Sequence, residues 1–117
     1  MNLIDIVGKQ IELNPNLLYM SGNPDNPGDA VTRQIVDALL ETGVAFSHVN
    51  ISVNSEIATA VEKMTGDRDF PQLFIGGRYA GRPTVILTMH HDKKLEKFMS
   101  GAIENARISA GAPPVVR

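Results

Sequence analysis

The chain has 117 residues, of which 43% are hydrophobic and 21% charged, a balance typical of one soluble globular domain. Its net charge of −2 provides no basic field for nucleic acid, and no apolar stretch approaches the roughly 20 residues of a membrane span. The chain contains no cysteine, which excludes disulfides, thiolate catalysis and cysteine-ligated metals within it.

The N-terminal half predicts two helices and two strands around a polar loop. Residues 2–13 carry apolar side chains near helical spacing, and residues 17–20 form a short apolar run typical of a strand buried on both faces. The loop Ser21–Gly28 contains two prolines, two asparagines and two glycines, and its length mildly favours a functional role. Residues 30–42 predict a helix that ends at Gly43 in a left-handed conformation, with an apolar face of Val31, Ile35, Val36, Leu39 and Leu40. The segment 46–51 then predicts a strand parallel to the first.

The C-terminal half predicts a helix, a hairpin and two closing helices. Asn54 or Ser55 can cap a helix whose apolar face includes Met64. Residues 70–81 predict a β-hairpin with Gly76-Gly77 as its turn, and Pro83 suits the first position of the next helix. A last helix follows from residue 95, with apolar side chains at Leu95, Phe98, Met99, Ile103 and Ala106.

This order of elements predicts an α/β protein with a four-stranded mixed sheet flanked by helices, which is the architecture of the thioredoxin fold. We expect one domain over residues 1–110 and a flexible C-terminal tail over residues 111–117, where Pro113-Pro114 stops regular structure. The first residues lack the cationic and apolar regions of a signal peptide, so we expect a cytoplasmic protein.

Several segments resemble the CGFS-type monothiol glutaredoxins, in register from about residue 4 to residue 98. The residues that carry the resemblance are Leu18-Tyr19-Met20-Ser21-Gly22-Asn23-Pro24, Pro27, Arg33-Gln34, Phe70-Pro71-Gln72-Leu73-Phe74 and Ile86-Leu87-Thr88-Met89-His90. The resemblance implies a thioredoxin/glutaredoxin-like fold in which Pro71 follows a cis peptide bond and faces a helix N-terminus.

The same resemblance shows where the chain departs from the family. Family members place a thiolate at the start of the helix after the loop, bind glutathione beside it, and as dimers hold a [2Fe–2S] cluster with it. Here the Cys-Gly-Phe-Ser positions read Asp29-Ala30-Val31-Thr32, the expected lysine is Ser21, and the threonine before the aromatic-Pro pair is Asp69. The Gly-Gly-Cys-Asp turn of the family reads Gly81-Arg82-Pro83-Thr84. The clustered changes predict that the thiol and glutathione functions were lost together.

Asp29 and Arg82 each admit two interpretations. Asp29 is well placed to cap the helix by accepting N–H bonds from Val31 or Thr32, and the alternative is an acid/base or hard metal ligand, with Asp69 as the nearest second carboxylate. Arg82 either pairs with Asp29 or Asp69 across the groove or is a solvated arginine at a turn. The three histidines lack the spacing of a helical metal pair, and we expect no metal site. The methionines at positions 20, 64, 89 and 99 are expected in the core.

We therefore predict a cysteine-less glutaredoxin-like protein without thiol–disulfide oxidoreductase activity and with no catalytic residue, acting as a protein- or peptide-binding module related to iron–sulfur and redox homeostasis. Alternatives are residual glutathione or small-ligand binding, and iron–sulfur assembly with a thiol-bearing partner. The resemblance implies a BolA-type protein or an iron–sulfur or redox client as partner, and we expect a monomer or weak homodimer, no required cofactor, and no nucleic-acid or membrane partner. The predicted ligand-binding residues are Ser21, Asp29, Asp69, Phe70, Pro71, Arg82 and Thr84.

Overall fold

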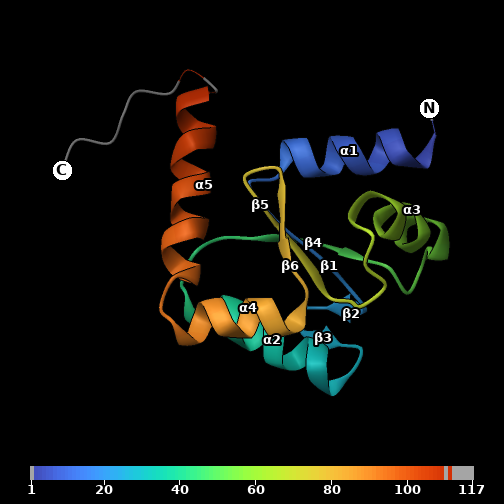
Figure 1. Ribbon diagram of the computed structural model, residues 1–117, viewed down its shortest axis with the longest axis horizontal. Helices are drawn as coiled ribbons and strands as arrows, with labels where there is room; N and C mark the ends of the chain where they lie inside the picture. The colour runs from blue at the N-terminus through green and yellow to red at the C-terminus, as the bar shows by residue number, and fades with distance from the viewer. Residues whose placement is uncertain (1, 110, 112–117) are drawn as a thin grey trace.

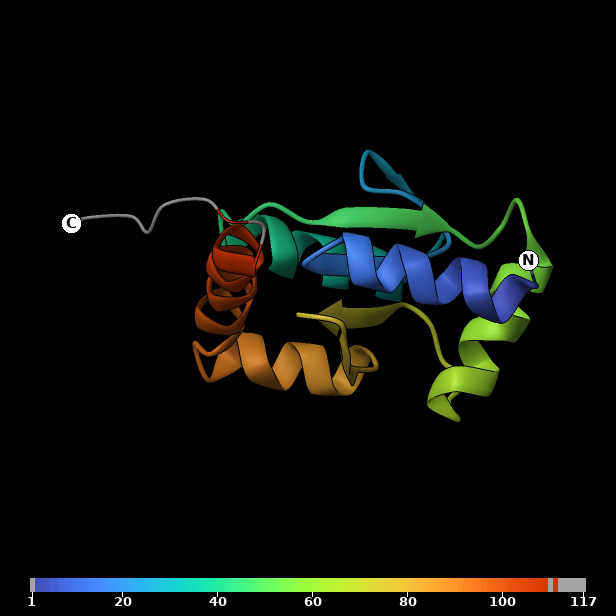
Figure 2. The ribbon, with the colours of Figure 1, turned by 90° about the horizontal axis from the view of Figure 1, so that it is seen from above.

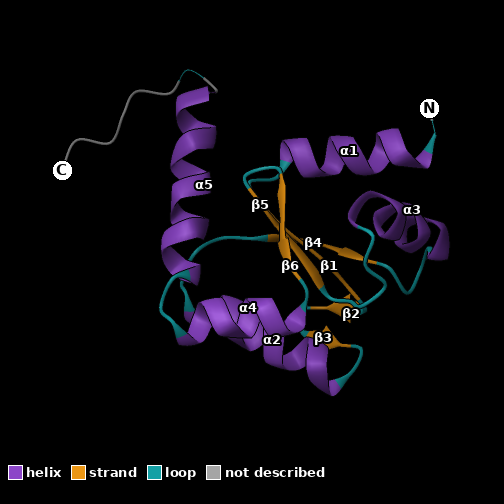
Figure 3. Ribbon diagram, viewed as in Figure 1, coloured by secondary structure: helices purple, strands orange, loops and turns teal. Residues whose placement is uncertain are grey.

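The computed structural model describes residues 2–109 and 111. Its central feature is the predicted four-stranded mixed sheet with helices on both faces (Figure 1, Figure 3). The elements in chain order are α1 (Leu3–Leu13), β1 (Asn16–Met20), β2 (Gly22–Asn23), β3 (Asn26–Pro27), α2 (Ala30–Glu41), β4 (Ser47–Asn50), α3 (Ser55–Thr65), β5 (Gln72–Ile75), β6 (Arg78–Gly81), α4 (Pro83–His91) and α5 (Leu95–Ser109).

The sheet has the strand order β4-β1-β5-β6, with β4 parallel and β5 antiparallel to β1. All five residues of β1 are buried, as predicted for this apolar run. Because side chains alternate along a strand, Leu17 and Tyr19 pack with α1 and α3, whereas Leu18 and Met20 pack with α2, α4 and α5. Figure 2 shows α5 at one end of the molecule and α3 at the other.

Capping residues explain where several helices begin and end. Asn2 accepts a hydrogen bond from the Asp5 amide at the start of α1, and Asn54 accepts one from Glu56 at the start of α3. Gly43 has a φ of +71° after α2, as predicted. Pro83 occupies the first turn of α4, where its missing N–H costs no helical bond.

The loop between β1 and α2 contains a short antiparallel ladder of β2 and β3 that the sequence did not predict. The side chain of Asn23 accepts hydrogen bonds from the amides of Asp25 and Asn26, which forms the turn between them. Gly22 has a φ of +81°, and a Cβ there would lie 2.4 Å from the Asn26 carbonyl oxygen. Strands of two residues are too short to leave a periodic pattern in a sequence.

Some residues predicted on buried helix faces are exposed. The buried side chains of α2 include Thr32, Ile35, Val36 and Leu39, spaced as one helical stripe, and this phase turns Val31 and Leu40 to solvent. Met64 in α3 and Phe98 in α5 are also exposed, whereas Met20 and Met99 are buried and Met89 is partly buried, as predicted. The core therefore uses narrower helix faces than the apolar residues alone suggested.

The hairpin and the helix after it agree with the sequence prediction. The Phe70-Pro71 peptide bond is cis, and both turn glycines, Gly76 and Gly77, have positive φ values, as type I′ turns require. Except for Gly111, the predicted tail over residues 111–117 lies outside the described residues. None of the helices within residues 2–109 is long and apolar enough to cross a membrane.

Candidate functional site

A hollow of about 390 Å³ lies where the N-termini of α2 and α4 meet the loop before β5. We call it the hollow, and it is lined by Asp29, Val31, Arg68, Asp69, Phe70, Arg82, Pro83 and Thr84. Its volume lies at the lower end of the range of small-molecule and peptide side-chain pockets. Its lining combines a few apolar side chains with both signs of charge.

Asp29 is the N-cap of α2. Its backbone is extended and its Oδ1 accepts a hydrogen bond of 2.8 Å from the Thr32 amide, which confirms the predicted capping interaction. The carboxylate also lies where the unpaired amides and dipole of α2 favour negative charge. Asp29 therefore has a structural role at the position where the resemblance places a thiolate.

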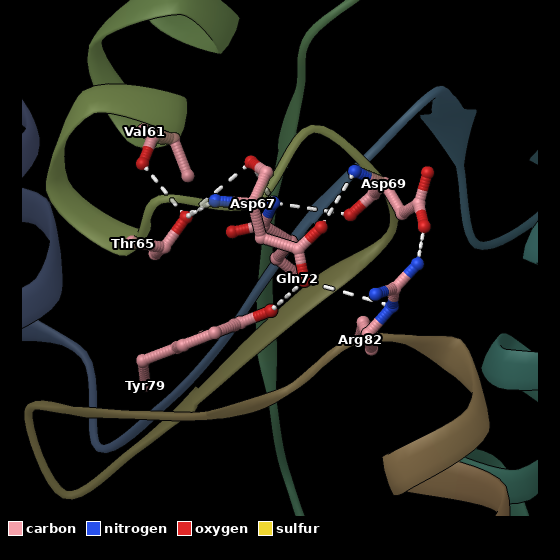
Figure 4. Close-up of polar contacts among 7 residues, drawn as sticks. All are labelled: Val61, Thr65, Asp67, Asp69, Gln72, Tyr79 and Arg82. Atoms are coloured by element: carbon pink, nitrogen blue, oxygen red, sulfur yellow. Dashed lines mark hydrogen bonds and ion pairs between the residues drawn. The ribbon is translucent and has the colours of Figure 1, made fainter.

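Arg82 pairs with two carboxylates in the loop before β5, as Figure 4 shows. Its Nη2 forms an ion pair with Asp69 Oδ2, and its Nε lies 3.6 Å from Asp67 Oδ2. Of the two predicted interpretations, the ion pair with Asp69 is confirmed, and Arg82 is not merely solvated at a turn. The guanidinium bridges two carboxylates.

Asp67 links this ion pair to the sheet. Its Oδ2 accepts a hydrogen bond of 2.9 Å from the Tyr79 hydroxyl, and its Oδ1 accepts one of 3.0 Å from the Asp69 amide. Burial, together with the hydrogen bond to Asp67 and its negative charge, raises the pKa of the Tyr79 phenol above its ordinary value of 10.0. The phenol thus stays protonated and keeps donating to Asp67.

Gln72, at the start of β5, also holds the loop that carries Asp67 and Asp69. Its side chain is fully buried, and its Nε2 donates to the backbone carbonyls of Asp67 and Asp69 at 2.9 and 3.0 Å. Thr65 accepts a hydrogen bond from the Asp67 amide at the end of α3. These hydrogen bonds, drawn in Figure 4, fix the loop that carries Asp67 and Asp69.

The structure brings together five of the seven predicted ligand-binding residues. Asp29, Asp69, Phe70, Arg82 and Thr84 all line the hollow. The other two, Pro71 and Ser21, do not line it. Their role in ligand binding stays a prediction, as does that of the five.

The two remaining residues have structural surroundings. Pro71 is buried. The Ser21 hydroxyl lies 2.7 Å from that of Ser52, and its backbone carbonyl accepts from the Gly28 amide.

Sequence reasoning missed Val31, Arg68, Asp67 and Tyr79 as part of this region. The apolar spacing predicts Val31 on the buried face of its helix, whereas its side chain is exposed. The polar residues at 33, 34 and 37 mark the solvent-facing side of this helix and are the signal that could have placed Val31 there. Arg68 lies between two aspartates in a polar loop, a local signal for a charged surface. The partnership of Asp67 with Tyr79 depends on the hairpin and leaves no local signal.

The hollow holds few groups suited to metal binding or nucleophilic chemistry. Within the described part of the chain, no three His, Cys, Asp or Glu side chains are grouped to hold a metal ion. Arg68 has no ion-pair partner among the described residues, and Arg82 at the start of α4 does not cap that helix with its side chain. The Arg68 guanidinium and the backbone amides at the start of α4 can therefore donate hydrogen bonds to a carboxylate or a backbone carbonyl of a ligand.

Comparison with protein families and curated sequences gives consistent matches. A glutaredoxin family model matches residues 31–80. The chain is 35% identical over 107 residues to glutaredoxin 4 of Buchnera aphidicola (Schizaphis graminum), covering 92% of this chain and 100% of that protein. It is 34% identical over 104 residues to the mitochondrial monothiol glutaredoxin-S15 of Arabidopsis thaliana, covering 89% of this chain and 62% of that protein.

Solved structures confirm the fold. The structure of a buckwheat glutaredoxin–glutathione complex matches with a TM-score of 0.75 at 18% identity, covering 86% of this chain and 89% of that chain. The holo form of glutaredoxin C1 from Populus tremula x tremuloides matches with a TM-score of 0.75 at 16% identity, covering 86% and 97% of the two chains. The predicted thioredoxin/glutaredoxin-like fold is thus confirmed.

Proposed function

This chain belongs to the glutaredoxin family, close to glutaredoxin 4 and the monothiol glutaredoxins, and from that premise we propose that it binds a protein or peptide without thiol–disulfide exchange. One observation carries the proposal. In a chain without cysteine, the helix start that faces the hollow is occupied by Asp29, which caps α2.

Chemistry supports the loss of exchange activity. Disulfide exchange and glutathionylation require a sulfur nucleophile, which a carboxylate cannot replace. Iron–sulfur clusters are held by thiolates, and this chain offers none, so its residues do not fit a cluster. In addition, Asp69 and Arg82 stand at positions where the resemblance expects residues of the glutathione site, and here these two side chains form an ion pair with each other.

The shape of the hollow supports recognition of an extended segment. Phe70 lines the hollow and β5 begins only at Gln72, so the Phe70 backbone lies beyond the sheet ladder and beside the hollow. An extended peptide can pair with such a backbone while its side chains contact Val31. As partner we propose a BolA-type protein or another client of monothiol glutaredoxins, in cytoplasmic iron–sulfur and redox homeostasis, with the chain a monomer or weak homodimer.

The test titrates the isotopically labelled chain with a purified BolA-type protein and follows amide chemical shifts. We expect shifts around Phe70, Arg82 and Thr84, and we expect Val31→Glu to weaken binding about tenfold because it places a charge in the hollow. Leu40→Glu is the matched control, because Leu40 is an exposed apolar residue of the same helix away from the hollow. Absence of binding, or equal effects of the two variants, would overturn the proposed partner. Turnover of a glutathione mixed disulfide by the purified chain would overturn the absence of exchange.

A second candidate is residual binding of glutathione. It is favoured by the start of α4 and by Arg68, which has no ion-pair partner within residues 2–109. Titration with glutathione at millimolar concentration distinguishes the two candidates. Chemical-shift changes at Arg68 and Thr84 would support glutathione binding, and unchanged spectra would rule it out.

A further inference from the structure

A second concave surface lies at the other end of β6, between that strand, α4 and α5. We call it the groove; its volume is about 650 Å³, larger than that of the hollow. Figure 1 shows α5 beside the β5–β6 hairpin, with α4 running crosswise near the N-terminal end of α5. No function described above uses this surface.

The floor and one wall of the groove are apolar. Ile75, Ala80 and Met89 line it and pack partly against the core below. Phe98 of α5 contributes to the wall and keeps 46% of its surface exposed, so it extends the apolar surface of the groove to solvent. An apolar surface of this kind, once covered, would contribute binding free energy in proportion to the area removed from water.

The charged residues of the groove have one sign. Arg78 and Lys97 line it, and none of the ten lining residues is acidic, although the chain as a whole is negatively charged. Neither cation has an ion-pair partner within the part of the chain that the structure describes. Carboxylates of a partner can therefore approach both cations without displacing an existing ion pair.

We propose that the groove binds a short acidic–apolar segment of a partner protein, with an apolar side chain against Phe98 and carboxylates paired with Arg78 and Lys97. The occupant is identified by its complementarity to the groove: apolar at its centre and negatively charged beside it. This interaction is separate from the one proposed for the hollow, and either can hold without the other.

Gly101 gives a way to block the groove without disturbing the fold. It lines the groove from within α5, and a Cβ built there meets nothing within 4 Å. Gly101→Leu should fill the groove while improving the helix propensity of α5. An unchanged or raised unfolding midpoint verifies that this variant is folded.

The experiment uses the full chain and synthetic peptides with a central leucine or phenylalanine flanked by glutamates. Counterparts in which lysine replaces glutamate serve as reversed-charge probes. We expect the acidic peptides to shift amides of β6 and α5, with affinity falling as salt is raised. We expect Lys97→Glu and Arg78→Glu each to weaken binding about fivefold, and Gly101→Leu to weaken it about tenfold or more. Arg33→Glu, an exposed reversal on α2, is the matched control and should change nothing.

The proposal would be overturned by no binding of any acidic peptide, by equal binding of the lysine counterparts, or by binding that survives Gly101→Leu. Shifts confined to the residues of the hollow would also overturn it, because they would assign the peptides to the other site.

Discussion

The hollow and the groove lie at opposite ends of β6 and differ in whether their cations are paired. In the hollow, Arg82 is already paired with Asp69 and Asp67, so a ligand must compete with existing interactions. In the groove, Arg78 and Lys97 have no such partners among the described residues. Arg82 in the hollow is thus already paired with carboxylates of the chain itself, whereas the two cations of the groove can pair with carboxylates of the proposed partner.

Two glycines offer the strongest contrast between the two ends. At Gly81, beside the hollow, a Cβ would lie 2.5 Å from Val85 Cγ1, whereas at Gly101 the space is open. We expect Gly81→Ala to lower the free energy of unfolding by about 1–3 kcal/mol, because Val85 must move. We expect Gly101→Ala to raise it by about 0.5–1 kcal/mol through helix propensity. Urea unfolding measures both, and changes of the same sign would contradict the contrast.

Substitution of Asp67 tests whether its hydrogen bonds stabilise the loop beside the hollow. Asp67→Ala removes the acceptor for Tyr79 and for the Asp69 amide, and we expect a loss of about 2–3 kcal/mol in chemical unfolding. The exposed Asp25 is the control, and Asp25→Ala should change stability by less than about 0.5 kcal/mol. A similar loss for both variants would show that Asp67 is not a specific anchor.

Alkaline pH should weaken the same anchor. Because the pKa of Tyr79 is raised in the folded chain, the folded state holds the phenolic proton more tightly than the unfolded state. This contribution is fully present below pH 10 and is lost as the pH rises above that value, so the melting temperature should fall there. Tyr79→Phe should show a shallower fall, with the remainder coming from Tyr19, whose phenol pKa is raised by burial. Identical pH profiles for the two proteins would contradict the assignment.

The smallest effect on stability is expected from replacing the arginines, Arg82 in the hollow and Arg78 in the groove. Arg82→Ala removes an ion pair whose side chains are about half exposed, and we expect a loss of about 0.5–1 kcal/mol that shrinks at high salt. Arg78→Ala, in the groove, should leave stability unchanged, because Arg78 forms no ion pair with any residue that the structure describes. Thermal melts at low and high salt compare them, and a salt-independent loss for Arg82→Ala would indicate packing rather than charge.

Most of the fold could be predicted because its signals are local. The apolar run of β1, the Gly76-Gly77 turn, and the caps Asn54 and Asp29 each depend on a few neighbouring residues. The β2–β3 ladder was missed because it depends on a turn around Asn23 and on a contact between Gly22 and Asn50 across the loop.

The candidate site was predicted only in part, for a related reason. Residues quoted for the family resemblance, such as Phe70, and the substituted positions Asp29 and Arg82 do meet at the hollow. Asp67 was not predicted, since its importance comes from the hairpin that returns Tyr79 and Arg82 to it. The groove likewise combines side chains of the β5–β6 hairpin, α4 and α5, and it depends on how these elements pack together, so no single sequence motif predicts it.

The complete burial of β1 has a consequence for hydrogen exchange. This strand is paired on both sides, by β4 and β5, and covered on both faces, so its amides can exchange with solvent only when the whole domain opens. The amides of Leu18 and Tyr19 should therefore exchange at the rate of global unfolding. Those of the exposed β2–β3 turn should exchange orders of magnitude faster, through local opening.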